Sequence, residues 1–308
     1  MGDFFNTVMF PLYWVVSVIL MGWHSLFSTV LPADSGWTWA LSIVGLTVLV
    51  RAALIPLFVK QIKSSRNMQM LQPKVKELQT KYGHDRERLA QETMALYKDA
   101  GTNPFASCLP ILMQAPIFLA LFRVLNEATG AISEGLGVLS DADAAELDRA
   151  SLFGVEISNR FIGAAGDWRV YLMCGFLVAL MTVTTFITQR QLMRKNMPES
   201  ALTGPYAQQQ KMLLYILPVA FAVGGVAFPV GVLLYWTTSN LWTMGQQFYV
   251  IRNNPAPGTP AFDAKVARDT KKGKVVPAAA AEPATPTVID PPKRQQPKKS
   301  SRNQRRRR

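Results

Sequence analysis

Long apolar segments constrain the fold of this chain more than any other feature of its sequence. A helix needs about 20 apolar residues to cross the hydrocarbon core of a bilayer. Four regions reach that length, namely 37–59, 104–125, 168–189 and 212–251. The last region has room for two spans, and the sequence GGVAFPVG allows a tight turn inside it. We therefore predict an all-α integral membrane protein whose core is a bundle of five transmembrane helices. The predicted spans are 37–59, 104–125, 168–189, 212–228 and 230–251.

Basic residues indicate which connections face the cytoplasm. Lys and Arg are concentrated in residues 60–103 and 190–211, whereas the connection 127–167 is acidic. An excess of Lys and Arg marks the cytoplasmic loops of membrane proteins, so 127–167 is predicted to be an outer loop. Most of the formal net charge of +13 lies in residues 253–308, which contain few large apolar side chains. We expect this segment to be a disordered basic tail in the cytoplasm.

Residues 1–35 contain a further apolar segment, 8–31, whose position relative to the membrane is ambiguous. Ser17 and His24 fall on one face of a helix over this segment, and Trp23 falls on the other. Such a division into a polar and an apolar face is typical of a helix at the membrane surface. We predict an outer interfacial helix within 1–35, and a sixth span is the alternative.

The connection 60–103 is predicted to form a cytoplasmic helical hairpin rather than a flexible loop. Apolar residues recur at steps of three and four as far as Tyr82, and Gly83 then interrupts the helix. Asp85 can cap a second helix, which Gly101 ends. This hairpin, the five spans and the outer loop together make up a predicted core domain over 36–252.

Arg51 places a permanent charge inside the predicted span 37–59. It lies about 13 Å from the cytoplasmic end, farther than an arginine side chain reaches by snorkelling. An ion pair inside the bundle would need a carboxylate, yet the five predicted spans contain no Asp or Glu. We therefore predict a hydrophilic groove that keeps Arg51 hydrated, although each polar residue near it could instead bond only to its own helix. The candidate lining residues are Thr47, Gln114, Thr182, Thr184, Thr185, Thr188, Gln189, Thr237, Thr238, Ser239 and Asn240.

The residues available to such a groove argue against catalysis and against coupled transport. The two histidines, His24 and His84, lie outside the five predicted spans, and Cys108 and Cys174 are too far apart in sequence to suggest a chelating pair. We therefore predict no enzyme activity, no metal and no other cofactor. A transporter would be expected to show an inverted repeat or an intramembrane acid, and we find neither in the sequence. A positive groove instead suits the attraction of an acidic, hydrophilic peptide segment into the membrane.

Three stretches of the chain carry a family resemblance: MQMLQPKVKELQTKYG, DRERLAQETMALYKDAGTNPFASCLPILMQAPIFLALFRVL and FPVGVLLYWTTSNLWTMGQQ. They closely resemble the YidC-type membrane protein insertases of the YidC/Oxa family, over about residues 8–252. The resemblance implies that Arg51 lies in a groove open to the cytoplasm and to lipid. It also implies substrate contacts at Thr47 and Trp236 and a groove glutamine at Gln189. The family's cytoplasmic hairpin matches 60–103, whose candidate contact residues are Lys74, Lys76, Lys81, Arg86 and Arg88.

The resemblance also implies what the protein does. It indicates an insertase that inserts and helps fold nascent membrane proteins, alone or with the Sec translocon, and that is active as a monomer. The short form and the Ala-, Arg- and Pro-rich tail are most similar to an actinobacterial member, so we expect a multi-pass protein of the bacterial plasma membrane with a cytoplasmic C-terminus. The charge of the tail suits the ribosome or anionic lipids, and a simple topology signal is the alternative. A chaperone that only assists folding and a transporter are the alternative functions.

Overall fold

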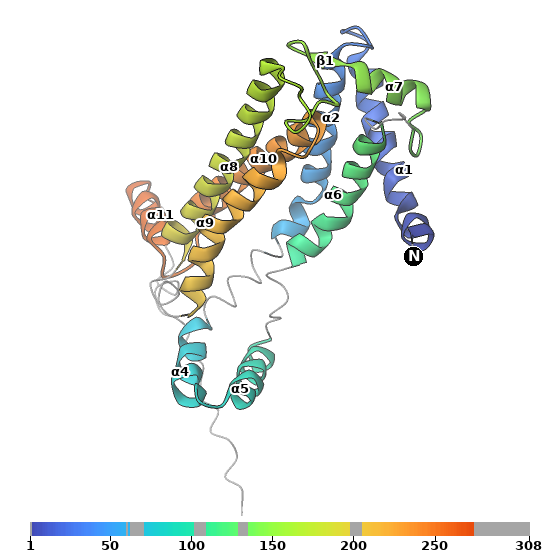
Figure 1. Cartoon of the computed structure of the whole chain (residues 1–308). Coiled ribbons are helices and arrows are strands. Elements are labelled where there is room, and N and C mark those ends of the chain that lie inside the picture. The colour runs from blue at the N-terminus through green and yellow to red at the C-terminus, as the bar shows by residue number, and fades with distance from the viewer. Residues whose placement is uncertain are drawn as a thin grey trace, which may run out of the picture. The chain divides into compact units, whose positions relative to one another are not determined.

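The computed structural model describes residues 2–59, 61, 71–101, 109–128, 135–197 and 205–273, and these are mostly helical (Figure 1). The helices are α1 (Gly2–Phe27), α2 (Gly36–Ala53), α4 (Gln72–Tyr82), α5 (Arg86–Asp99), α6 (Leu109–Ala128), α7 (Asp141–Arg149), α8 (Trp168–Asn196), α9 (Pro205–Gly225), α10 (Val230–Asn253) and α11 (Pro260–Lys271). Two short strands, β1 (Ser151–Leu152) and β2 (Val155–Glu156), pair antiparallel between α7 and α8. The predicted helical fold class is confirmed.

Several helices have the length and composition of membrane spans. Among the described residues, three segments are long and apolar enough to cross a membrane: Thr7–Phe27, Gly36–Ala53 and Trp168–Asn196. A shorter apolar stretch, Leu214–Gly225, ends α9. α9 and α10 are separate helices, as the GGVAFPVG turn predicts, while the first residues of the predicted span 104–125 lie outside the described part. The core of five spans therefore stays a prediction.

The predicted span 37–59 is not one continuous helix. α2 begins after Ser35, whose Oγ accepts a hydrogen bond from the Trp37 N–H at 3.3 Å, and it ends at Ala53. Leu54 forms a turn, and residues 55–59 are helical again. Pro56 accounts for the interruption, because proline has no N–H to donate and its ring clashes with the carbonyl four residues earlier. The prediction of an unbroken helix was wrong here, and Arg51 lies in the last turn of α2.

Part of the predicted disordered tail is folded. Thr259 caps α11, since its Oγ1 accepts a hydrogen bond from the Phe262 N–H at 3.4 Å, and Pro260 occupies the first position of the helix. This Thr-Pro pair is a helix-start signal that the sequence analysis missed. α11 packs against α8 and α10 and buries Ala261. Disorder over all of 253–308 is therefore wrong for 260–271, and residues 274–308 lie outside the described part.

α1 packs along α2 and α6 and contributes to the main apolar core. Tyr13, Val16 and Leu20 of α1 are buried there with Trp39 and Ile43 of α2. α1 and α2 lie close together, and a Cβ on Gly45 of α2 would come within 2.7 Å of the Trp23 ring of α1. This packing makes α1 an integral part of the helical assembly.

The face of α1 that the sequence analysis assigned to water is buried. The Ser17 hydroxyl accepts a hydrogen bond from the Val138 N–H at 3.0 Å, and His24 is only 7% exposed. Most exposed positions of α1 are apolar instead, and they include Phe10 and Val18, although Ser25 is also exposed. The argument from a polar outer face was therefore wrong, because these polar groups serve contacts to the outer connection. The exposure pattern favours a lipid-facing helix, and the choice between an interfacial helix and a sixth span stays a prediction.

The predicted outer connection, 127–167, is an ordered unit in the part that the structure describes. A capping box begins α7, in which the Asp143 N–H donates to the Ser140 Oγ at 3.2 Å and the Ser140 N–H donates to the Asp143 carboxylate at 3.0 Å. β1 lies directly on the start of α2, where a Cβ on Gly36 would come within 2.0 Å of the Ser151 carbonyl oxygen. Glycine at position 36 is what allows this close approach.

The predicted hairpin consists of α4 and α5, which pack against each other. Gly83 ends α4, and the Asp85 carboxylate accepts a hydrogen bond from the Arg88 N–H at 3.0 Å at the start of α5. Gly101 follows α5 with a φ of +61°, a conformation that favours glycine. The two helices, the cap and the terminating glycine are confirmed. Residues 62–70 and 102–108 lie outside the described part, and the location of the hairpin in the cytoplasm stays a prediction.

Candidate functional site

Arg51 reaches from the last turn of α2 to Ser239 on α10. Its Nε donates a hydrogen bond to the Ser239 Oγ at 3.0 Å, and its Nη2 donates to the same oxygen. The side chain is half-buried, and its guanidinium carbon lies 5.8 Å from the centre of the Phe58 ring. Ser239 itself is only 3% exposed. The arginine is therefore held in a defined position by a neutral hydroxyl.

No carboxylate neutralises Arg51 within the described part of the chain. The ion pair found there lies elsewhere, between Arg123 and Glu127 at 2.7 Å, and the Glu146 carboxylate lies 3.6 Å from the His24 Nε2. A hydroxyl accepts hydrogen bonds but carries no charge, so Ser239 fixes the guanidinium without cancelling its charge. The sequence prediction of an arginine without an intramembrane acid is consistent with this geometry. Ser239, one of the candidate lining residues, binds the guanidinium.

Tyr235 and Gln114 extend the polar cluster. Tyr235 lies one turn before Ser239 on α10, and its side chain interacts with both Ser239 and Arg51. The Gln114 Nε2 on α6 donates a hydrogen bond to the Tyr235 hydroxyl at 2.9 Å. The Gln114 Oε1 is buried and has no hydrogen-bond partner among the described residues. Side chains from α2, α6 and α10 thus meet around one charge, and one buried acceptor among them is unsatisfied.

Most of the predicted threonines of the groove bond to their own helices. Thr47 lies one turn before Arg51 and is 1% exposed, and its Oγ1 donates to the Ile43 carbonyl at 2.7 Å. Thr182, Thr184, Thr185 and Thr188 likewise donate to carbonyls three or four residues earlier on α8. These hydroxyls are satisfied locally, which was the alternative left open for each of them. A substrate contact at Thr47 stays a prediction.

Trp236 and Gln189 lie in different surroundings. Trp236 is half-buried in an aromatic cluster, with ring-centre distances of 5.3 Å to Phe118, 4.9 Å to Phe221 and 5.7 Å to Phe228. Gln189 is half-buried on α8, and the structure shows no hydrogen bond from it to another described residue. The structure therefore brings Gln114 to the Arg51 cluster, places Trp236 on the same helix as Ser239, and shows no link to Gln189.

The sequence analysis underrated two residues of the cluster. Ser239 was one of many candidate lining residues, and Tyr235 was not considered. The signal that could have identified both is their spacing in YWTTS, because residues four apart share one helix face. Asn240, also a candidate, instead connects α10 to α8, since its Nδ2 donates to the Thr185 Oγ1 at 3.1 Å.

The basic residues of the predicted hairpin do not all face the same surroundings. Lys74 and Lys81 line a cavity of about 370 Å³ between α4 and α5, together with Glu77, Glu92 and Asp99. Arg88 lies over the Tyr82 ring at 5.0 Å. Arg86 is exposed and Lys76 half-buried. Their role as contacts for a partner stays a prediction.

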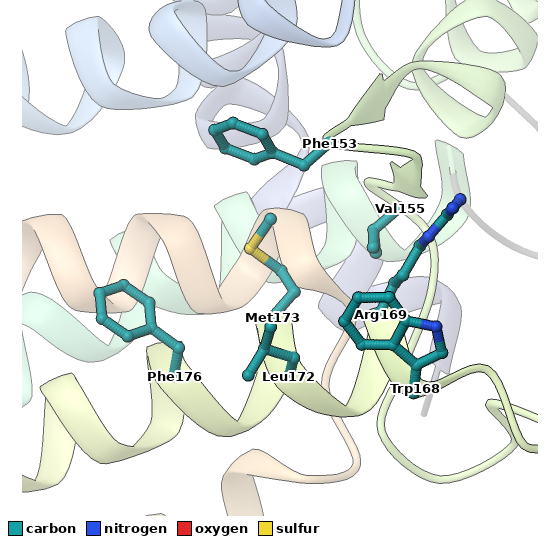
Figure 2. A pocket seen from close by; sticks show the side chains of 7 residues that line it. All are labelled: Phe153, Val155, Trp168, Arg169, Leu172, Met173 and Phe176. Carbon is teal, nitrogen blue, oxygen red and sulfur yellow. The ribbon is translucent and has the colours of Figure 1, made fainter.

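A second cavity, of about 390 Å³, lies at the start of α8 (Figure 2). Its lining is apolar apart from one cation, Arg169, and consists of Phe153, Val155, Trp168, Arg169, Leu172, Met173 and Phe176. Figure 2 shows Trp168 and Arg169 at one end of this cavity and Phe176 at the other. Within the part of the chain that the structure describes, no cluster of His, Cys, Asp and Glu suited to a metal ion is present.

Comparisons with known proteins give a consistent result. Residues 30–257 match the family described as 60Kd inner membrane protein. A membrane protein insertase YidC from Streptomyces avermitilis is 47% identical over 84% of this chain and 61% of its own length. A YidC from Tropheryma whipplei is 36% identical over 85% of this chain and 89% of its own length. One from Mycobacterium tuberculosis is 36% identical over 80% of this chain and 73% of its own length.

One solved structure is also similar to this chain. It is described as an active YidC insertase crystal structure with the first transmembrane domain resolved. The TM-score is 0.48 at 24% sequence identity, over 80% of this chain and 46% of that one. The chain thus spans about half of the length of that protein and 61% of the length of the Streptomyces relative.

Proposed function

This chain belongs to the 60Kd inner membrane protein family, which includes the YidC membrane protein insertases, and from that membership we propose that it inserts and helps fold integral membrane proteins. The apolar helices agree with a multi-pass protein of the plasma membrane. Its clients are nascent membrane proteins, and it acts as a monomer, alone or beside the Sec translocon. No chemical step is needed, because moving a helix from water into lipid is favourable once its polar end crosses the membrane.

The uncancelled charge of Arg51 is the observation that carries this proposal. Arg51 has five N–H donors, and those bound in the described structure go to Ser239, which leaves further donors for an incoming carboxylate. An acidic segment that approaches Arg51 replaces part of its lost hydration with a charge-assisted hydrogen bond. The cost of carrying that segment through the apolar region falls accordingly.

The unsatisfied Gln114 Oε1 supports a hydrated groove. A buried acceptor without a partner costs about 1–3 kcal/mol, so native structures usually satisfy it with water. A water molecule at this position, or a backbone N–H of a client, would donate a hydrogen bond to the Gln114 Oε1 beside Tyr235 and Arg51. The groove would be open towards the cytoplasm and lipid, and Thr47, Gln189 and Trp236 would contact the client.

The remaining parts of the chain would serve delivery. The hairpin 60–103 and the basic tail would lie in the cytoplasm, where a ribosome or an incoming chain arrives. Lys74, Lys76, Lys81, Arg86 and Arg88 would contact those partners, and the ribosome and anionic lipids are the candidates for the tail. The C-terminus would be cytoplasmic, because the basic segments lie on that side.

Reconstitution into liposomes tests the proposal. Insertion of a short substrate with an acidic translocated tail should occur there without other factors. Arg51→Glu should reduce that insertion at least about tenfold, equivalent to about 1.4 kcal/mol, because it repels the acidic tail. Arg51→Lys should largely retain it, since the charge is kept. A substrate whose translocated tail is neutral should be much less sensitive to both changes.

Arg123→Gln is the matched control, because Arg123 also lies on a long apolar helix but already pairs with Glu127. It should leave insertion unchanged. Equal activity of wild type and Arg51→Glu on acidic tails would refute the electrostatic mechanism. If no insertion occurs but refolding of a client is improved, the chaperone function is supported instead, and flux of a small solute would indicate a transporter.

A further inference from the structure

Three basic side chains converge on one cavity at the ends of α8 and α10. The cavity has a volume of about 450 Å³, and α11 folds over it. Lys195 of α8, Arg252 of α10 and Arg268 of α11 all line it. The volume lies within the range of small-molecule sites, which is about 300–1,000 Å³. No residue of this cavity belongs to the Arg51 cluster, so the cavity is a separate site.

No carboxylate among the described residues balances the positive charge of this cavity. None of the three cations has a carboxylate within ion-pair distance among the described residues. Asp263 and Asp269 lie on α11, but neither lines the cavity. The Arg268 Nη2 donates a hydrogen bond to the main-chain carbonyl of Arg252 at 2.7 Å, which fixes the Arg268 guanidinium at the end of α10. Like charges that line one cavity repel, and a bound anion removes that cost.

Apolar side chains complete the lining. They are Phe248, Tyr249, Ile251, Pro260, Ala261 and Ala264. Phe248 is 45% exposed and Tyr249 is 67% exposed, so aromatic surface continues outward from the charged cavity. Aromatic residues and long basic side chains are typical of the boundary between hydrocarbon and lipid headgroups. α8 supports this position, because it continues from a candidate span into its basic last turn.

We propose that this cavity, between α8, α10 and α11, binds one anionic phospholipid. Its phosphate would be held by Lys195, Arg252 and Arg268, and an acyl chain would lie along Phe248 and Tyr249. The Gln191 side chain also lines the cavity, and its Oε1 is buried without a partner among the described residues, so it can accept a hydrogen bond from a headgroup hydroxyl. The occupied site would fix α11 to the membrane surface.

A lipid fits these residues better than a nucleic acid does. An RNA strand follows an extended basic groove and stacks successive bases, whereas these cations surround one compact cavity with a largely aliphatic and aromatic lining. A single phosphate with an apolar chain matches both the convergence of charge and the lining. The proposal concerns lipid binding and does not depend on whether the chain inserts membrane proteins.

The double variant Lys195→Gln, Arg252→Gln tests the site with little risk to the fold, because neither side chain makes a hydrogen bond to another described residue. Arg268 and its bond to the Arg252 carbonyl remain. The control is Arg190→Gln, Arg194→Gln, which removes the same charge from exposed positions of α8 outside the cavity. Full-length protein in detergent is titrated with phosphatidylglycerol, and native mass spectrometry counts the lipids retained. Phosphatidylcholine serves as the uncharged probe.

We expect wild type and control to retain one phosphatidylglycerol more tightly than phosphatidylcholine, and the Lys195/Arg252 variant to lose it. The loss of affinity should be about thirtyfold, since each basic residue near an anionic lipid contributes roughly a factor of five. Equal retention by this variant and the control would overturn the proposal. Displacement of the bound phosphatidylglycerol by millimolar inorganic phosphate would also overturn it. So would a Lys195/Arg252 variant that loses binding to a single-stranded RNA while its lipid binding is unchanged.

Discussion

Replacing Ser239 by alanine tests whether Arg51 lies in a dry or a hydrated site. Arg51 donates from two nitrogens to the Ser239 Oγ, so this one substitution removes every hydrogen bond that the described structure gives to the guanidinium. In a dry site, a hydrogen bond to a charged group contributes about 1.5–3 kcal/mol. In a hydrated site, water replaces the serine as the hydrogen-bond acceptor, so most of this contribution is not lost on substitution.

A double-mutant cycle isolates this energy. Arg51→Met, Ser239→Ala and the double variant are unfolded in micelles, and the free energy of unfolding is measured by far-UV circular dichroism at equilibrium. A hydrated groove predicts a coupling free energy below about 1 kcal/mol, because water replaces the serine as the hydrogen-bond acceptor. The cycle excludes the separate effects of each substitution on packing.

The same cycle with Ser42→Ala is the control. The Ser42 hydroxyl donates to the Thr38 carbonyl within α2, and position 42 lies about 13 Å along the helix from Arg51. Its coupling to Arg51 should be close to zero. A coupling between Arg51 and Ser239 above about 1.5 kcal/mol would show that water does not replace the serine, and it would refute the hydrated groove.

Two further predictions concern the fold. Gly36→Ala should lower the free energy of unfolding by about 1–3 kcal/mol, because its Cβ would meet the Ser151 carbonyl. Gly22→Ala, which has open space around it on α1, should raise the free energy of unfolding by about 0.5–1 kcal/mol. Equal thermal unfolding of the two variants would contradict the close approach of β1 to α2. Asp85→Ala should destabilise α5 by about 1 kcal/mol and speed amide hydrogen exchange in residues 86–90, while insertion by the core is unchanged. Unaltered exchange in residues 86–90 would show that the cap does not stabilise the hairpin.

The sequence predicted the helices better than their surroundings. Apolar length and the GGVAFPVG turn located α8, α9 and α10, because composition alone decides whether a segment is stable in lipid. The sequence did not show which side of α1 is exposed. The polar residues Ser17 and His24 looked solvent-facing by periodicity, but Ser17 is hydrogen-bonded to Val138, and His24 lies 3.6 Å from Glu146, both more than a hundred residues away. Helical periodicity records that two faces differ, and it does not record which face the rest of the chain covers.

The candidate site shows the same division. Arg51 could be singled out from sequence, because a permanent charge among apolar residues is costly wherever it lies. Its partner stood out much less, since Ser239 is 188 residues away and was one of many polar residues in the predicted spans. The threonines were overrated for a similar reason, because a hydroxyl that bonds to its own helix carries no outward sign of doing so. The α11 helix was missed because net charge suggested disorder, although Thr259 and Pro260 form a local start signal.

Pro56 changes how the position of Arg51 should be understood. In an unbroken span, Arg51 would lie in the interior of a helix, far from either dipole end. Because the helix is interrupted at Leu54, Arg51 lies in the last turn of α2, where the carbonyl groups carry a partial negative charge. A cation in that position gains about 0.3–1 kcal/mol and keeps its full charge. The proline therefore lowers the cost of the arginine without supplying a carboxylate, and the charge stays available for the acidic segment of a client that we propose.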